Sequence, residues 1–143
     1  MEYLECVTFL LLDGEKVLTE KRRDDKPLDP GLVAIPGGHV DPGETVEQAL
    51  KREVMEELAL TVDAFQYLCT LLHYARVHPS DKHIAEVQRI HYYLIDSWHG
   101  ELQSLEAASL HWLPLSKAQS IDVEADRVAL GELIRYRHLA DKS

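Results

Sequence analysis

The stretch that decides the fold is PGGHVDPGETVEQALKREVMEELAL, from Pro36 to Leu60. It begins with a Gly-Gly pair and continues into Asp-Pro-Gly, a turn sequence in which proline presets φ and glycine accepts the position that follows. Thr45 stands three residues before Gln48, which is the spacing of a capping box at a helix start. We therefore expect a turn followed by a helix over 45–58.

The expected helix directs acidic side chains toward the protein interior. At about 100° per residue, its apolar side chains share one arc of the helix surface: Val46, Ala49, Leu50, Val54 and Leu58. Glu53 and Glu57 fall inside this arc, and Glu56 falls at its edge beside Arg52. A buried carboxylate without a partner loses several kcal/mol of solvation free energy. These acids therefore need a positive charge beside them.

A divalent cation would supply the missing positive charge, because Arg52 is a single cation for three acids. Carboxylate oxygens favour magnesium or manganese over zinc. An acid-rich helix can also be an ordinary solvated surface helix, and the helix alone leaves that alternative open.

The whole segment resembles the signature of the Nudix hydrolase family. That signature reads Gly, five residues, Glu, seven residues, Arg-Glu, an apolar residue, any residue, Glu-Glu, any residue, Gly and an apolar residue. The matching residues are Gly38, Glu44, Arg52, Glu53, Val54, Glu56, Glu57 and Leu60. Ala59 departs from the pattern because it stands where the family has glycine, the residue that suits a left-handed helix end.

The resemblance implies a catalytic set of five residues: Glu44, Arg52, Glu53, Glu56 and Glu57. Among them, Glu53, Glu56 and Glu57 would bind Mg²⁺ or Mn²⁺. Arg52 would hold these glutamates in position, and Glu44 would support that arrangement from the preceding loop. The number of metal ions is left open.

The resemblance also implies a function, the hydrolysis of a nucleoside diphosphate linked to a further moiety. Water would attack one phosphorus of the pyrophosphate, and Gly37 and Gly38 would lie at the substrate and bring a backbone carbonyl toward the metal. A nucleoside triphosphate or an ADP-sugar would be such a substrate, and the sequence does not select between them. Two alternatives remain: a non-catalytic Nudix-fold nucleotide-binding or regulatory module, and a diphosphate isomerase, which would need a cysteine or acid near the metal.

The order of elements around the signature predicts one α/β domain spanning 1–143, with a mixed β-sheet between helices in the α/β/α sandwich of the Nudix type. We expect strands at 4–12, 16–22, 31–36, 62–76, 87–96 and 109–115, with a tight hairpin turn at Asp13-Gly14. A second helix is expected over about 123–139, with an apolar set of Val128, Leu130, Leu133 and Ile134.

Composition restricts the partners. The net charge of −10 argues against binding a nucleic-acid polymer, which requires a basic surface. No stretch approaches the roughly 20 apolar residues that span a bilayer, so we expect no membrane partner and a cytoplasmic protein. Cys6 and Cys69 have no zinc or redox spacing around them and are expected to be buried thiols. A homodimer formed by edge strands is left open.

Residues outside the signature offer further candidates without a decisive pattern. Asp81 and Glu86, in the loop 76–86, are candidates for the general base, as are the glutamates of the signature. Trp112 would stack on a base or pack in the core. The other candidate substrate contacts are Tyr74, Arg76, Arg89 and the pair Arg22-Arg23. The eight histidines show no spacing typical of a zinc site.

Overall fold

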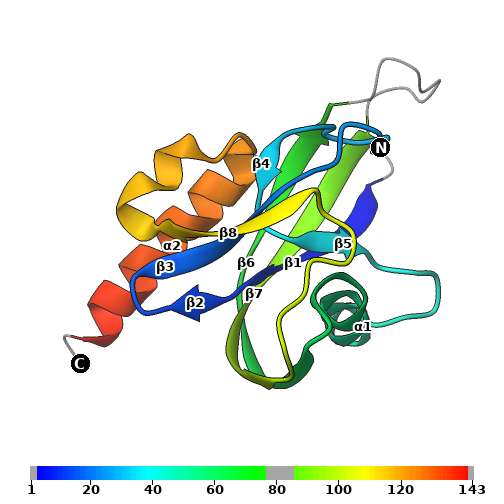
Figure 1. Ribbon diagram of the computed structural model, residues 1–143. Helices are drawn as coiled ribbons and strands as arrows, with labels where there is room; N and C mark the ends of the chain where they lie inside the picture. Colours follow the sequence, from blue (N-terminus) through cyan, green and yellow to red (C-terminus); the bar gives the residue numbers. More distant parts are fainter. Residues whose placement is uncertain (1–2, 77–85, 142–143) are drawn as a thin grey trace.

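The computed structural model describes residues 3–76 and 86–141. Two four-stranded sheets lie between helix α1 (Val46–Leu58) and helix α2 (Glu124–Ala140) (Figure 1). This arrangement confirms the predicted α/β class, with helices on both sides of β-structure. The sequence predicted one sheet, whereas the strands divide into two.

The first sheet is mixed and has the order β5-β1-β7-β6. Strand β1 (Leu4–Leu10) runs parallel to β7 (Glu86–His99) and antiparallel to β5 (Gly37–His39) on its other side. Strand β6 (Thr61–Ala75) pairs antiparallel with β7 in a long, bulged ladder. Strand β1 is therefore a central strand, and β5 carries the Gly-Gly pair beside it.

The second sheet is antiparallel and is built around β3 (Lys16–Lys21). Strand β3 pairs with β2 (Leu12–Asp13), β4 (Val33–Ala34) and β8 (Ser109–Pro114). A 3₁₀ segment, η1 (Leu115–Ser120), leads from β8 toward α2. The two sheets are joined at Leu11, where the chain leaves β1 and enters β2.

One predicted strand and one predicted turn differ from the structure for identifiable reasons. The predicted strand 31–36 ends as β4, and β5 begins one residue after Pro36, which has no N–H group for a ladder. The N–H of Ile35 donates instead to the carboxylate of Asp126 at 2.8 Å. The hairpin turn is displaced by one residue from its predicted place, because Asp13 pairs with Lys16 and the loop is therefore Gly14-Glu15. Gly14 has φ of 59°, as a type II′ turn requires at its first central position.

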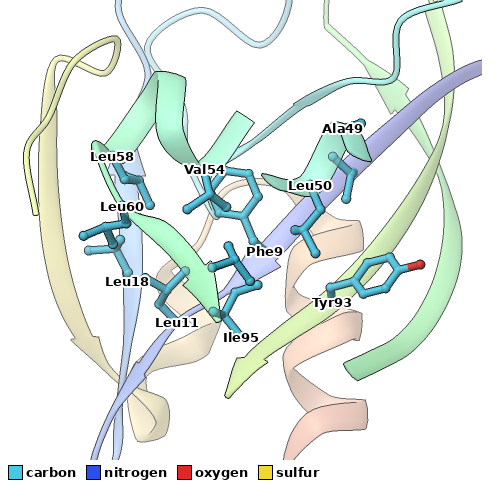
Figure 2. Close-up of a cluster of buried hydrophobic side chains, with 12 residues drawn as sticks. Phe9, Leu11, Leu18, Ala49, Leu50, Val54, Leu58, Leu60, Tyr93 and Ile95 are labelled. Atoms are coloured by element: carbon cyan, nitrogen blue, oxygen red, sulfur yellow. The ribbon is translucent and has the colours of Figure 1, made fainter. Parts of the chain in front are cut away.

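The apolar arc of α1 packs onto both sheets. Figure 2 shows Leu50 and Val54 of α1 facing Phe9 of β1, while Leu58 and Leu18 lie at the side where β3 passes. Side chains alternate along a strand, so neighbouring residues of β1 and β3 serve the opposite face. There Leu10 and Val17 pack with the α2 residues Leu130 and Leu133.

Helix α2 buries a different set of residues from the one predicted. Leu130 and Leu133 are buried as expected, but Val128 and Ile134 are 52% and 44% exposed. Ala125 and Ala129 complete the buried face, because alanines allow the helix to lie close to the sheet.

Within the described residues, neither helix has the length and apolar character of a membrane span. Cys6 is buried and Cys69 half-buried, and both are free thiols.

Candidate functional site

Helix α1 begins at a capped position fixed by the sequence. Thr45 Oγ1 accepts from the N–H of Gln48 at 3.1 Å, and the Gln48 side chain accepts from the N–H of Thr45 at 2.9 Å. This is the predicted capping box. Glu44 is fixed just before it, since its carboxylate accepts from the N–H of Asp41 at 2.9 Å. The cap sets the rotation of α1 and therefore the direction of every glutamate on it.

The end of α1 is unusual for its residue type. Ala59 has φ of 60° and ψ of 30°, the left-handed conformation, and its N–H donates to Met55 O at 3.0 Å. The helix therefore ends with the geometry that the family sequence assigns to glycine, although Ala59 carries a Cβ.

Arg52 is held by five hydrogen bonds. Its Nε and Nη2 donate to Glu44, both at 2.8 Å, and Nη2 also donates to the carbonyl of His39 at 2.9 Å. Its Nη1 donates to Glu53 at 2.9 Å and to Glu56 at 3.0 Å. A guanidinium has five N–H donors, so these contacts occupy all of them. The hydrogen bonds from Arg52, together with the Asp41 N–H, lower the pKa of Glu44 to about 2.

Glu53 and Glu57 face the interior, as the helical period predicts. Glu53 is 9% and Glu57 8% exposed, whereas the side chain of Glu56 is 47% exposed. Burial raises the pKa of Glu53 despite its bond to Arg52, and burial together with the charges of Glu20 and Glu53 raises the pKa of Glu57. Among the described residues, no group hydrogen-bonds the buried Oε2 of Glu57. The site holds more carboxylate charge than its arginines compensate.

The Gly-Gly pair of β5 provides close approach rather than a turn. A Cβ on Gly38 would overlap the carboxyl group of Glu53, and a Cβ on Gly37 would overlap the Val7 carbonyl and the Thr8 hydroxyl. Neither glycine has positive φ. Both positions therefore require glycine because other groups of the protein occupy the space of a side chain.

A cavity of about 290 Å³ opens beside these residues. Glu53, Glu57 and Gly38 line one part of it, and His73 and Asp126 are also in its wall. The lining also includes Ala34 of β4 and Ile90 of β7, together with polar residues from other segments. The acidic residues of α1 are thus continuous with a space large enough for a small molecule.

Two buried acids of this region have no counterpart among the predicted site residues. Glu20 of β3 is 5% exposed, and burial raises its pKa to about 7 although Arg22 Nη1 lies 3.4 Å away. Asp126 of α2 is 2% exposed and accepts from the Tyr92 hydroxyl at 2.6 Å. The alternation of KVLTEK, which puts Leu18 and Glu20 on one face of the strand, is the signal that points to Glu20.

The remaining candidates are distributed around the molecule. Trp112 packs against the apolar cluster under α1 and does not line the cavity. Arg89 forms an ion pair with Glu5 and lies over the ring of Tyr3. Tyr74 and Arg76 line a second hollow between β6 and α2.

Two candidates, Arg22 and Glu86, are close to the acids or their surroundings. Arg22 lines the cavity, while its sequence neighbour Arg23 is exposed and bonded to Asp25. The Oε1 atom of Glu86 lies 3.6 Å from Nε2 of His39, the residue that follows the Gly-Gly pair. Asp81 lies outside the described residues.

The acidic side chains of α1 have the donor chemistry that a divalent cation needs. Over residues 3–76 and 86–141, no three His, Cys, Asp or Glu side chains already surround one point. The donor set is nevertheless suitable, since Arg52 uses one oxygen each of Glu53 and Glu56 and leaves each a second oxygen. Glu57 adds a buried oxygen that has no partner in the described part of the chain. Hard oxygen donors of this kind are those that Mg²⁺ or Mn²⁺ prefers.

Comparison with known proteins supports the resemblance seen in the sequence. A family model described as the NUDIX domain matches residues 3–133. The chain belongs to the Nudix family. This Nudix chain is 52% identical over 46 residues to the nucleoside triphosphatase NudI of Escherichia coli strain K12, a match that covers 32% of each protein. The chain therefore spans about a third of the length of that relative.

Two longer matches cover most of the Nudix chain. An 8-oxo-dGTP diphosphatase of Buchnera aphidicola subsp. Schizaphis graminum is 27% identical over 115 residues, which are 79% of this chain and 78% of that protein. The crystal structure of a MutT NUDIX hydrolase from Burkholderia pseudomallei has a TM-score of 0.74 at 24% identity, over 92% of this chain and 98% of that one. The structural match establishes the likeness of the fold.

Proposed function

We propose that this Nudix chain is a hydrolase that cleaves the pyrophosphate bond of a nucleotide with the help of Mg²⁺ or Mn²⁺. The observation that carries the proposal is the pair of buried carboxylates on α1, Glu53 and Glu57, of which Glu57 keeps an unpartnered oxygen. A cation bound there would neutralise phosphate oxygens and make water a stronger nucleophile. It would also allow a protein of net charge −10 to hold a polyphosphate.

The surrounding residues have positioning roles in this proposal. Arg52 holds Glu53 and Glu56 at a fixed separation through one nitrogen, and its other nitrogens tie it to Glu44 and to the backbone of β5. Because every donor of Arg52 is used within the protein, we assign it no contact with the substrate. Gly37 and Gly38 leave the space in which the Glu53 carboxylate lies against the backbone.

The general base is assigned to an acid close to the Gly-Gly pair. Glu86 is the candidate among the described residues outside α1, because its carboxylate lies 3.6 Å from His39 and its side chain is 18% exposed. A partly exposed carboxylate at the edge of the site is suited to accept a proton from water. The glutamates of α1 are the alternative.

The substrate class that we would test first is the nucleoside triphosphates. Support comes from the names of two relatives, a nucleoside triphosphatase and an 8-oxo-dGTP diphosphatase. ADP-sugars and dinucleoside polyphosphates also contain a pyrophosphate linked to a nucleoside, and the α1 acids would treat that group in the same way.

The experiment is a panel assay with the purified protein. Nucleoside and deoxynucleoside triphosphates, 8-oxo-dGTP, ADP-ribose and a dinucleoside polyphosphate are incubated with Mg²⁺, with Mn²⁺ or with EDTA. We expect release of phosphate or pyrophosphate together with a nucleotide product, only in the presence of a cation, and catalytic efficiencies rank the substrates. Binding of a nucleotide without turnover under every condition would favour the non-catalytic module instead.

The role of the α1 acids is tested by Glu56→Gln and Glu57→Gln. Each variant keeps the shape of the side chain and removes one charge, so we expect turnover to fall by about 10–100-fold or more while the chain stays folded. The matched control is Glu47→Gln, an exposed residue on the same helix. Near-normal turnover of either variant at limiting Mg²⁺ would contradict the assignment.

A further inference from the structure

The geometry points to Glu20 of β3 as a fourth acidic residue of the cation site. This inference rests on the proposed function, since it concerns the same cation, and it adds a residue that lies outside the Nudix signature. Glu20 stands far from the signature helix in sequence but is brought under that helix by the second sheet.

The backbone of β3 fixes the direction of the Glu20 side chain. Glu20 pairs with Ala34 on one side and with Leu110 on the other, so the backbone of β3 is held between two neighbouring strands at this point. Leu18, two residues earlier, belongs to the apolar cluster that contacts α1. Residues two apart on a strand share a face, and Glu20 therefore points to the same side as Leu18, beneath the C-terminal half of α1.

The charge of Glu20 is poorly compensated within the protein. The residue is 5% exposed, and its cationic neighbour Arg22 lies 3.4 Å away, longer than the roughly 2.7–2.9 Å of a strong charge-assisted bond. Arg22 directs its Nε and Nη2 to the carbonyl of Leu28 instead, at 3.1 and 2.8 Å. A buried carboxylate with one long ion pair still needs positive charge.

Glu57 provides the second, independent observation. It is 8% exposed, and its Oε2 is buried without a hydrogen-bond partner in the described residues. Residues 105–108 connect the two acids, because this segment hydrogen-bonds the carbonyl of Glu57 at 3.1 Å and the carbonyl of Lys21, the residue after Glu20, at 2.9 Å. Two buried acids on elements joined in this way, one with an unpartnered oxygen, form a place that a divalent cation would stabilise.

The segment after β7 contributes a further acidic residue near the end of α1. The N–H of Leu105 donates to the carbonyl of Glu57 at 3.1 Å and thereby fixes the segment after β7 on the end of α1. Glu106, the next residue, lines the same cavity as Glu57. Acids from β3 and this segment would thus add to the α1 acids that the signature supplies for the cation.

The test measures cation binding rather than turnover. Mn²⁺ affinity is determined by electron paramagnetic resonance of free Mn²⁺ for the wild-type chain, Glu20→Gln and Glu57→Gln, with Mg²⁺ titration calorimetry as a second readout. We expect Glu20→Gln to weaken Mn²⁺ binding by about 10-fold or more. The matched control is Glu15→Gln, because Glu15 is exposed at the hairpin before β3.

The outcomes separate this inference from the proposed function. If the wild-type chain binds Mn²⁺ and Glu57→Gln does not, while Glu20→Gln binds within about twofold of wild type, then Glu20 has only a structural role and this inference is wrong. If the wild-type chain itself binds no Mn²⁺ or Mg²⁺, the proposed function fails. Circular dichroism in EDTA checks folding, and if Glu20→Gln does not fold, Glu20→Asp, which retracts the carboxylate by one methylene, decides by the same Mn²⁺ measurement.

Discussion

Ala59 is the residue at which this chain departs from its family signature, and the structure gives the physical meaning of the departure. With φ of 60°, Ala59 holds a conformation in which Cβ approaches the following carbonyl oxygen. The cost is about 1 kcal/mol for a single residue other than glycine. The chain tolerates this cost because the cap still makes its hydrogen bond to Met55.

We predict that Ala59→Gly stabilises the protein. Glycine relieves the left-handed strain, but it also gives the unfolded chain more conformational freedom, which offsets part of the gain. The free energy of unfolding, measured by urea titration, should rise by about 0.5–1 kcal/mol. Ala49→Gly is the control, because Ala49 is buried inside α1 and the same substitution there should lower stability. A loss of stability in Ala59→Gly would show that the Cβ of Ala59 makes contacts that outweigh its strain.

The sequence predicted the burial of some acids and missed that of others for one physical reason. Glu53 and Glu57 were predicted to face inward because a helix of known start has a fixed angular period, and both are buried. Asp126 was missed because its partners Ile35 and Tyr92 are distant in sequence. Glu20 was missed because the strand residues that flank it in the sheet, Ala34 and Leu110, are also distant in sequence. Local periodicity says which way a side chain points but not what it will meet.

At the scale of elements, the start of α1 determines the direction of its glutamates. Its N-terminus is set by Thr45 and its neighbours, and a shift of one residue would rotate every glutamate by about 100°. The capping box and the bonds of Arg52 to Glu44 hold the same end of the helix. The start of the helix is therefore also the reference for the direction of the acids.

We predict that Thr45→Ala lowers the free energy of unfolding by about 1 kcal/mol, because the N–H of Gln48 loses its acceptor. Urea titration measures the loss, and Thr45→Ser should recover most of it by restoring the hydroxyl. Thr61→Ala, at an exposed position at the start of β6, is the matched control and should change stability by a few tenths of a kcal/mol, on the order of a surface substitution. Equal effects of the two alanine variants would mean that the cap hydrogen bond does not contribute.

The strands show where a pattern of apolar residues stops being informative. The run LECVTFLLL was expected to form one strand, yet it changes sheets at Leu11, because Leu4–Leu10 pair with β7 and Leu12–Asp13 pair with β3. An apolar run indicates burial but not which partner a residue will pair with. The division into two sheets depends on long-range pairing and could not be predicted from the run itself.

At the scale of the whole molecule, Asp126 joins parts of the fold that are otherwise separate. From α2 it accepts hydrogen bonds from Ile35, between β4 and β5, and from Tyr92 of β7. Burial raises its pKa from 3.8 to about 6, although these hydrogen bonds favour the charged form. The ionisable groups around it are His73, Asp29 and Glu20.

We predict a stability that falls with pH because of this residue. The unfolded chain releases the Asp126 proton near pH 3.8 and the folded protein near pH 6, so the contribution of protonated Asp126 is complete below about pH 4 and is lost as pH rises through 6. The difference in free energy of unfolding between wild type and Asp126→Asn should therefore decrease by up to about 3 kcal/mol over that range. Urea titrations in EDTA at several pH values measure it, and parallel pH profiles for the two proteins would contradict it.

The position of β1 has a consequence for how the molecule is made. Its ladder joins Leu4 to Gln88 and Leu10 to Leu94, so the first strand pairs with a strand far along the chain. Closing so long a loop costs conformational entropy before the strand pairing contributes favourable contacts. Topologies of this kind therefore fold more slowly than those with local contacts. During synthesis on the ribosome, the amino-terminal segment would be exposed without its parallel neighbour until most of the chain had emerged, a period in which chaperones would protect it.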